Sequence, residues 1–151
     1  MKQKVEEQKI PTFPVVMEHQ IPLNRIADMI CCGMEGGIGY WSVITGYVKP
    51  PALTWTMSRM DRMGGHTALG DDVFKHIDYP LNEGGAVKLQ ETEDGGNHPI
   101  HHFNLEKIRK GLRVMAEKYP RHFHNFLEEN DDAETGDVFI QCCLFGEIVY
   151  G

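Results

Sequence analysis

The sequence predicts a single α+β domain spanning residues 1–151, in which a small antiparallel sheet packs on helices concentrated in the C-terminal half. Two observations lead to this prediction. Short strand-like runs between residues 73 and 103 are separated by the turn signals "NEGG" and "DGGN", which is typical of a meander. Apolar residues then recur at helical spacing from residue 105 to residue 145. A run of strands followed by a run of helices favours the α+β class, and 151 residues suit one domain with a real core.

The N-terminal quarter begins with a predicted flexible arm, residues 1–12. "FPVVMEHQI" (13–21) then reads as a short strand. Pro22 can open a helix as its first residue, and one apolar face follows at helical spacing: Leu23, Ile26, Ala27, Ile30 and Met34.

The stretch "GMEGGIGYW" (33–41) is expected to end this helix, because Gly33, Gly36 and Gly37 can enter left-handed conformations without steric cost. "YWSVITGYV" (40–48) is predicted as a strand, part of which could instead be helical. Neighbouring residues of a strand face opposite ways. We therefore expect Trp41 to be buried and Tyr40 to line a cleft beside Glu35.

Residues 49–72 form a loop that is too long to serve only as a connection between two secondary-structure elements. It can be an ordered loop in which its own Trp and Met side chains pack together, with a short helix at 54–63. It can also be a lid that carries Arg59 and Arg62. The chain then resumes with three predicted strands: "VFKHIDYPL" (73–81), "AVKLQET" (86–92) and "HPIHHF" (98–103).

Three helices complete the domain. Asn104 is expected to cap the first, which Tyr119-Pro120 ends, because a proline disfavours helix in the preceding residue. A second helix covers roughly 120–129. Asp132 or Thr135 caps the third, which ends at Gly146. This third helix is apolar almost all round, which suits the middle of a core or a subunit interface, and we expect a homo-oligomer. Gln141 is its one polar member, and "EIVYG" (147–151) could form a last short strand.

Charge and composition narrow the function classes. The formal net charge is −7, which disfavours direct nucleic-acid binding and membrane-surface binding, since both need a basic face. No apolar run reaches the ~20 residues of a membrane span, and the N-terminus has no apolar signal core, so we expect a cytoplasmic protein. The four cysteines form two adjacent pairs, Cys31-Cys32 and Cys142-Cys143, which favours reduced thiols packed on helices.

Several strings in the chain resemble a family of small proteins encoded by bacteriophages and prophages. They are "EGGIGYW", "YPLNEGGAV", "GLRVMAEKYPRHFHNFLEENDDAETGDVFIQ" and "LFGEIVYG". The resemblance covers most of residues 22–48 and 79–151 and leaves 49–78 without a counterpart. It implies a phage origin and a location in the bacterial host cytoplasm. That family has no settled activity, so the resemblance supplies no catalytic residues.

The glycine-rich stretch is the first candidate ligand site. It lacks the Lys-Ser/Thr of a phosphate-binding P-loop and the strand-to-helix context of a dinucleotide fingerprint. Its glycines and aromatics can be purely structural. In the functional alternative Glu35 accepts hydrogen bonds from a nucleobase edge while an aromatic ring stacks on the base. Arginines would supply the positive charge for a nucleotide-like ligand, although Arg109 can equally snorkel or form a salt bridge. The candidate ligand-binding set is Glu35, Gly36, Gly37, Tyr40, Arg59, Arg62 and Arg109.

Histidines and carboxylates are the second group of candidates. The metal-site candidates are His98, His101, His102 and Asp132, with His122 and His124 nearby in sequence. No clean three-ligand face is visible, and His122 and His124 diverge on a helix, so exposed histidines are the alternative and no cofactor is expected. The run "EENDDAETGD" (128–137) can gather at a helix N-terminus, hold Mg²⁺ or form an acidic patch for a basic partner.

Three function hypotheses follow. In the first, a phage accessory protein acts by binding, either sequestering a nucleotide-like host defence signal or occupying a host protein. In the second, a metal-dependent hydrolase uses the histidines of 98–102 and 122–124 with the acidic run 128–137. In the third, an acidic decoy inhibits a nucleic-acid-binding host enzyme.

Overall fold

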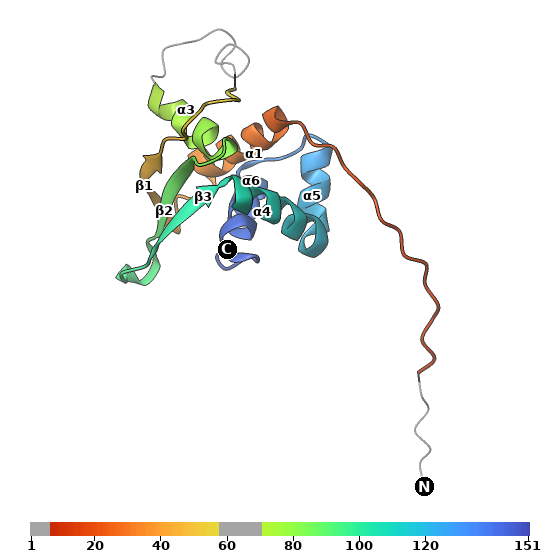
Figure 1. The fold of residues 1–151 in the computed structure, drawn as a ribbon. Coiled ribbons are helices and arrows are strands. Elements are labelled where there is room, and N and C mark those ends of the chain that lie inside the picture. The colour runs from red at the N-terminus through yellow and green to blue at the C-terminus, as the bar shows by residue number, and fades with distance from the viewer. Residues whose placement is uncertain (1–6, 58–70) are drawn as a thin grey trace.

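The computed structural model describes residues 7–57 and 71–151 and shows a small α+β domain with helices toward the C-terminus. The three strands form one antiparallel sheet in the order β1-β2-β3 (Figure 1). The fold class is confirmed. In chain order the elements are α1 (Leu23–Gly36), β1 (Ser42–Val48), α3 (Asp71–Asp78), the 3₁₀ turn η1 (Tyr79–Leu81), β2 (Ala86–Glu91), the 3₁₀ turn η2 (Glu93–Gly95), β3 (Ile100–Asn104), α4 (Leu105–Lys118), α5 (Pro120–Leu127) and α6 (Ala133–Phe145).

Helix α6 is the centre of the core. Every residue from Thr135 to Cys143 is buried, and the helix packs against both α1 and α4. The sequence left open whether this apolar helix lies in the core or at a subunit interface. Burial of its whole circumference within one chain places it in the core.

The contact between α1 and α6 gives Gly33 a different role from the predicted one. Gly33 lies inside α1 and faces Gly136 of α6. A Cβ atom on Gly136 would lie 2.4 Å from the Gly33 nitrogen, and one on Gly33 would lie 2.7 Å from the Gly136 carbonyl oxygen. The helix ends instead at Gly36, and Gly37 caps it with φ −108°. The helix therefore ends at the predicted loop, but Gly37 does not adopt the expected left-handed conformation, and Gly33 serves close helix packing rather than the stop.

The sheet packs its inner side chains on the helices. Val87 and Leu89 of β2 and Phe103 of β3 are fully buried, and the Phe103 ring meets the Phe139 ring of α6 edge-on at 6.5 Å. Strand β1 is an edge strand with a bulge at Thr45, between Ile44 and Gly46.

The strand predicted at 13–21 is wrong. Residues 7–20 are all exposed, and they extend away from the body as an arm with no regular secondary structure (Figure 1). β-Branched residues form a strand only where another strand supplies hydrogen bonds, and among the described residues none pairs with this segment.

The strand predicted at 73–81 is also wrong, since this segment forms α3 and η1. Ile77 and Leu81 are four residues apart and both are buried, at 1% and 3% exposure. Pro80, three residues after Ile77, is buried as well. Alternation along a strand would place Pro80 on the face opposite Ile77 and Leu81, whereas helical winding brings all three to one face.

The C-terminal half otherwise follows the predicted boundaries. The Asn104 side chain accepts a hydrogen bond from the Lys107 nitrogen and caps α4, and Asp132 caps α6 through the Thr135 nitrogen. Gly146, with φ 73°, ends α6 in the left-handed conformation. The last residues, 147–151, are not a strand.

The described start of the long loop, residues 49–57, has no helix. The buried Asn82 side chain holds it, accepting from the Trp55 nitrogen and donating to the Trp55 carbonyl. The remainder of the predicted helix 54–63, with Arg59 and Arg62, lies outside the described residues, so the lid stays a prediction.

Candidate functional site

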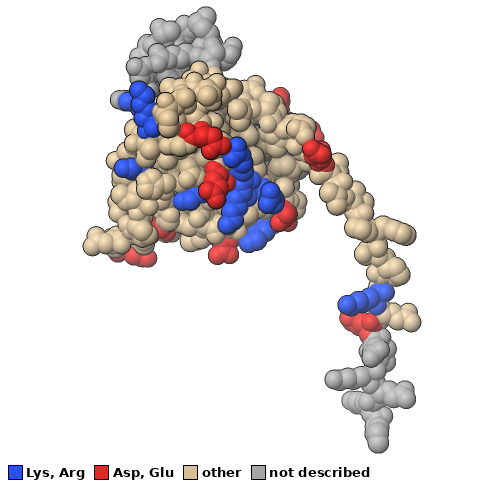
Figure 2. All heavy atoms as spheres, viewed as in Figure 1, with Lys and Arg blue, Asp and Glu red and all other residues tan. Residues whose placement is uncertain are grey.

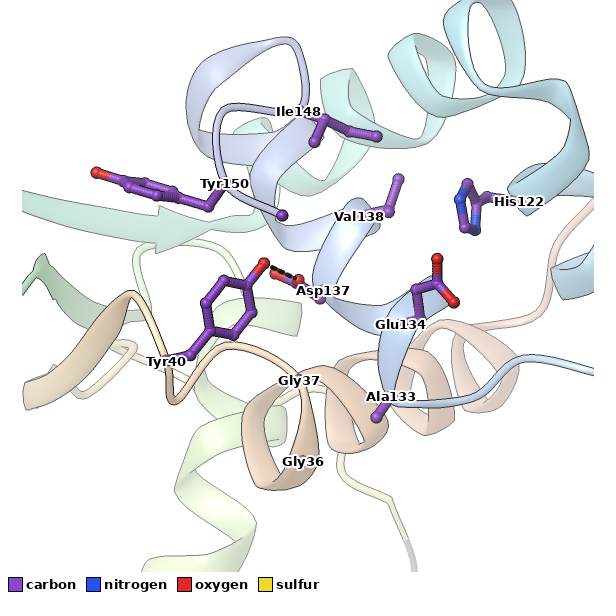
Figure 3. Close-up of a pocket in the computed structure, with 11 residues that line it drawn as sticks. Gly36, Gly37, Tyr40, His122, Ala133, Glu134, Asp137, Val138, Ile148 and Tyr150 are labelled. Atoms are coloured by element: carbon purple, nitrogen blue, oxygen red, sulfur yellow. Dashed lines mark hydrogen bonds between the residues drawn. The ribbon is translucent and has the colours of Figure 1, made fainter. Parts of the chain in front are cut away.

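The candidate site is a pocket of about 520 Å³ where the end of α1, the first turns of α6 and the C-terminal tail meet. Gly36, Gly37 and Tyr40 form one wall, and His122, Glu134 and Tyr150 belong to the others (Figure 3). These residues come from four separate parts of the chain, so the close packing of α1 on α6 creates the pocket.

Asp137 is the central group of this site. Its Oδ2 accepts a 2.7 Å hydrogen bond from the Tyr40 hydroxyl, and its Oδ1 accepts a 2.8 Å bond from Trp41 Nε1. Gln141 Nε2 also donates to Oδ1, at 3.0 Å. A buried carboxylate needs such donors, because removing it from water is otherwise costly. Tyr40 and Asp137 are joined by the dashed line in Figure 3.

Tyr40 and Trp41 are arranged partly as predicted. Trp41 is fully buried and Tyr40 is half exposed at the pocket. They do not lie on a strand, however. Both precede β1 in a turn, in which the Trp41 nitrogen donates to the Ile38 carbonyl. The turn lets the two side chains converge on one carboxylate, which alternation along a strand would not permit.

Tyr40 remains a hydrogen-bond donor over a wide pH range. Partial burial raises its pKa, the hydrogen bond to Asp137 and the charge of that carboxylate raise it further, and the resulting value is about 12. The phenol is therefore neutral at physiological pH, and its ring offers an uncharged stacking surface at the pocket.

Gln141 builds the opposite wall by fixing the tail. Its Oε1 accepts from the nitrogens of Val149 and Tyr150, and its Nε2 donates to the Tyr150 carbonyl as well as to Asp137. The Tyr150 ring then stacks on Trp41, with centroids 5.1 Å apart and an interplanar angle of 9°. The predicted need of this buried glutamine for partners is thus met by the tail itself.

Glu134, in the first turn of α6, is exposed at the pocket and is available for a ligand. His122 also lines the pocket, and its Nδ1 atom is buried and has no hydrogen-bond partner. No lysine or arginine belongs to the described lining. The pocket therefore suits a neutral or cationic group that donates hydrogen bonds, and it is poorly suited to a phosphate.

The predicted ligand residues separate into three groups. Gly36, Gly37 and Tyr40 line the pocket. Glu35 is exposed and does not belong to the described lining. Arg109 forms an exposed ion pair with Glu83 at 3.1 Å, so it is a surface arginine and is not directed into this pocket.

Sequence reasoning did not place Asp137, Glu134 and His122 in the ligand-binding set. It assigned Asp137 and Glu134 to the acidic run 128–137, which could gather at a helix N-terminus, hold Mg²⁺ or form an acidic patch, and it assigned His122 to the histidines of the hydrolase hypothesis. One signal could have singled out Asp137: it stands four residues before Gln141 in an otherwise apolar helix, and this spacing puts both on one face.

His101 of β3, and His98, which precedes this strand, lie beside the carboxylate of Glu91. His101 Nε2 lies 3.0 Å from Glu91 Oε2, and His98 Nδ1 lies 3.9 Å from the same atom. The Tyr150 hydroxyl donates to Glu91 Oε1 at 2.5 Å. Burial alone would raise the pKa of Glu91, but these hydrogen bonds and the nearby histidines outweigh it and lower the pKa.

The remaining metal candidates are dispersed. His102 is exposed on β3, and Asp132 is the α6 cap. Within residues 7–57 and 71–151, no group of three or more His, Cys, Asp or Glu side chains could hold a metal ion.

Part of the acidic run is committed to internal contacts. Asp131 accepts a 2.6 Å hydrogen bond from Arg25, whose guanidinium also lies 3.6 Å from Asp28. Figure 2 shows acidic and basic side chains intermingled on the face that it displays. Asp131, Asp132 and Asp137 each serve the fold, whereas Glu128, Glu129 and Glu134 are exposed.

The cysteines are free thiols, as predicted, and lie on α1 and α6. Burial raises the pKa of Cys32, and nearby carboxylates, first Asp131, raise it further. Burial also raises the pKa of Cys142 to about 12. Thiols held in this protonated state are poor nucleophiles.

No protein-family model matches this chain, and it has no match among curated proteins or solved structures. Among the described residues, no helix combines the length and the apolar character that crossing a membrane requires.

Proposed function

We propose that this chain is a phage-encoded accessory protein that works in the host cytoplasm by binding, without catalysing a reaction. The resemblance to phage and prophage proteins supports the origin. The pocket beside Asp137 carries the binding proposal, because it is open, largely apolar and retains an unpartnered His122 nitrogen.

The chemistry of the pocket favours a small planar molecule rich in hydrogen-bond donors. The Tyr40 ring can stack on such a molecule, and Glu134 can accept from its amino or imino groups. A nucleobase edge has this chemistry. The phosphates of a nucleotide-like defence signal would point to solvent, because no lysine or arginine belongs to the described lining.

The other hypotheses receive less support. A metal-dependent hydrolase needs its ligands in one place. His98 and His101 both lie beside Glu91, but no group of three or more His, Cys, Asp or Glu among the described residues could hold a metal ion, and Asp132 caps α6. An acidic decoy needs a continuous carboxylate face, and Asp131 and Asp137 are engaged inside the fold. Occupation of a host protein remains the second form of the binding hypothesis.

The test is capture of the natural ligand. The purified protein is incubated with bacterial lysate, washed and denatured, and the released small molecules are identified by mass spectrometry. We expect a heteroaromatic compound with amino or imide donors. Glu134→Gln should reduce its recovery, because a neutral amide is a weaker acceptor than a carboxylate.

The matched control is Glu117→Gln, which removes an exposed carboxylate from α4, outside the pocket. It should leave recovery unchanged. If no small molecule is recovered, or if both glutamine variants bind it equally, the proposed ligand site is wrong.

A further inference from the structure

The N-terminal arm carries apolar side chains that the described part of the chain leaves uncovered. Figure 1 shows the arm extending away from the helices and the sheet. Five of its residues are each between 72% and 95% exposed: Ile10, Phe13, Val15, Val16 and Met17. Isolated exposed apolar side chains are ordinary on protein surfaces, but a contiguous group of this kind marks an interaction site. The arm is therefore a candidate contact surface for another molecule.

Two prolines restrict the backbone of this segment before any partner binds. The rings of Pro11 and Pro14 fix φ at about −65°. Each proline also disfavours helix in the residue before it, Ile10 or Phe13, which is directed toward extended or polyproline II backbone. The structure gives this segment no regular secondary structure. A segment that is restricted beforehand loses less conformational entropy when a partner holds it.

The apolar side chains of residues 10–18 repeat with a period of three. A polyproline II helix has about three residues per turn, so residues three apart lie on one edge of it. Two of the three edges are entirely apolar, and the third holds both polar residues of the segment. The edges are Ile10, Phe13 and Val16; Pro11, Pro14 and Met17; and Thr12, Val15 and Glu18.

The same prolines argue against pairing of this segment as a β-strand. The backbone groups of successive strand residues point to alternate sides, so Pro11 and Pro14 would point to opposite sides. Whichever side faced a neighbouring strand, one proline would present no N–H group to it. In a polyproline II helix the two prolines lie on one edge, and the backbone needs no strand partner.

We propose that residues 10–17 are a polyproline II ligand that docks in an aromatic-lined groove of a partner protein. The string "PTFP" (11–14) has the P-x-x-P spacing that such grooves bind. The two apolar edges face the groove, and the edge with Thr12, Val15 and Glu18 faces solvent. This inference deepens the second form of the proposed function, occupation of a host protein, and rests on it.

Contacts at the base of the arm hold it against the body and leave the ligand segment projecting. The His19 ring meets the Phe123 ring of α5 edge-on, with centroids 5.6 Å apart, and Ile21 packs against the hydrophobic core. Residues 10–17 precede these contacts and span roughly 22 Å as a polyproline II helix. A partner groove can therefore engage the segment without displacing the helices of the body.

The first experiment titrates the isotope-labelled full chain with a set of purified SH3 and WW domains, which bind polyproline II segments. At least one domain should shift the nuclear magnetic resonance signals of residues 10–17 and leave those of α4 and α6 in place. Phe13→Ala should weaken this binding roughly tenfold. The control is Gln8→Ala, an exposed polar position on the same arm outside the segment, which should have no effect.

The second experiment tests the period of three with a matched pair of variants. Val15 and Val16 are neighbours, 82% and 95% exposed, and Val15→Ala and Val16→Ala remove the same methyl groups. Val16 lies on a docking edge and Val15 on the solvent edge, so only Val16→Ala should weaken domain binding, by about threefold or more. On a β-strand the order would be reversed, because Val15 would share the face of Phe13.

Three results would overturn the proposal. In the first, none of the domains shifts the signals of residues 10–17. In the second, Val15→Ala weakens binding as much as Val16→Ala does. In the third, the chain alone sediments as a dimer that Phe13→Ala dissociates, which would make a second copy the partner of the arm.

The pocket and the arm can be judged separately. Glu134→Gln changes the pocket and should leave domain binding unaltered. A chain that captures the proposed small molecule while its arm binds no domain contradicts this inference alone. A chain whose arm binds a domain while its pocket captures nothing contradicts the pocket proposal alone.

Discussion

Replacing Asp137 by alanine tests whether this carboxylate organises the pocket and its surroundings. Trp41 Nε1 is buried and donates to Asp137, so Asp137→Ala leaves that donor without its acceptor. An unsatisfied buried donor costs about 1–3 kcal/mol, and a hydrogen bond to a charged group contributes about 1.5–3 kcal/mol. The substitution also removes the desolvation cost of the buried Asp137 carboxylate, which offsets part of this loss. The expected net destabilisation is about 2–4 kcal/mol.

A graded comparison separates the charge of Asp137 from its hydrogen bonds. Asp137→Asn retains an oxygen that can accept from Trp41 and Gln141, and its amide can donate to the Tyr40 oxygen. It should cost about 1 kcal/mol. Urea unfolding followed by circular dichroism gives the free energies of unfolding. A loss of 2–4 kcal/mol corresponds to a melting temperature lower by roughly 4–16 °C in a chain of this size.

The control for this series is Glu117→Ala, which removes an exposed carboxylate on α4 and should change stability by less than about 0.5 kcal/mol. If Asp137→Ala is as stable as this control, the three hydrogen bonds contribute nothing and the central role of Asp137 is refuted. If Asp137→Asn is as destabilised as Asp137→Ala, the charge rather than the hydrogen bonding controls stability.

Three further predictions concern ionisation and packing. Tyr40 and Tyr150, whose pKa values are raised to about 12, should ionise near pH 12 in ultraviolet absorbance, and Tyr40→Phe should reduce the amplitude of this transition. Folding lowers the pKa of Glu91 below its ordinary 4.5. The ionised Glu91 carboxylate therefore stabilises the fold above pH 4.5, and this stabilisation is lost as the pH falls through the folded pKa. Glu91→Gln should therefore be less stable than the parent at pH 7, and the difference should shrink below pH 4.5; a constant difference would contradict this. Gly136→Ala should destabilise by about 1–3 kcal/mol or more in urea unfolding, because its Cβ would lie 2.4 Å from the Gly33 nitrogen; an unchanged midpoint would disprove the tight helix contact.

The helices of the C-terminal half could be read from sequence because their signals are local. The Asn104 cap, the Tyr119-Pro120 break and the Gly146 end each act within one turn of backbone, and each is found where it was predicted. Apolar spacing similarly indicated the buried face of α1. Local signals also predicted the strands β2 and β3, because the turns "NEGG" and "DGGN" delimit them.

The failures occurred where the outcome depended on distant partners. "FPVVMEHQI" has strand composition, but no described strand pairs with it, and it extends as an exposed arm. Residues 73–81 form a helix and a 3₁₀ turn, because the core buries Ile77, Pro80 and Leu81 together on one face. Local preference cannot decide such segments, since tertiary contacts outweigh it.

By itself, the sequence determined the fold class, the burial of Trp41, the partial exposure of Tyr40 and the requirement of Gln141 for hydrogen-bond partners. Only the tertiary structure decided that these residues meet at Asp137, and that Gly33 serves close packing rather than a helix stop. The physical reason is that a hydrogen-bond network joins residues about a hundred positions apart. The pairing of such residues is fixed by how α1 packs on α6, and no local pattern in the chain records it.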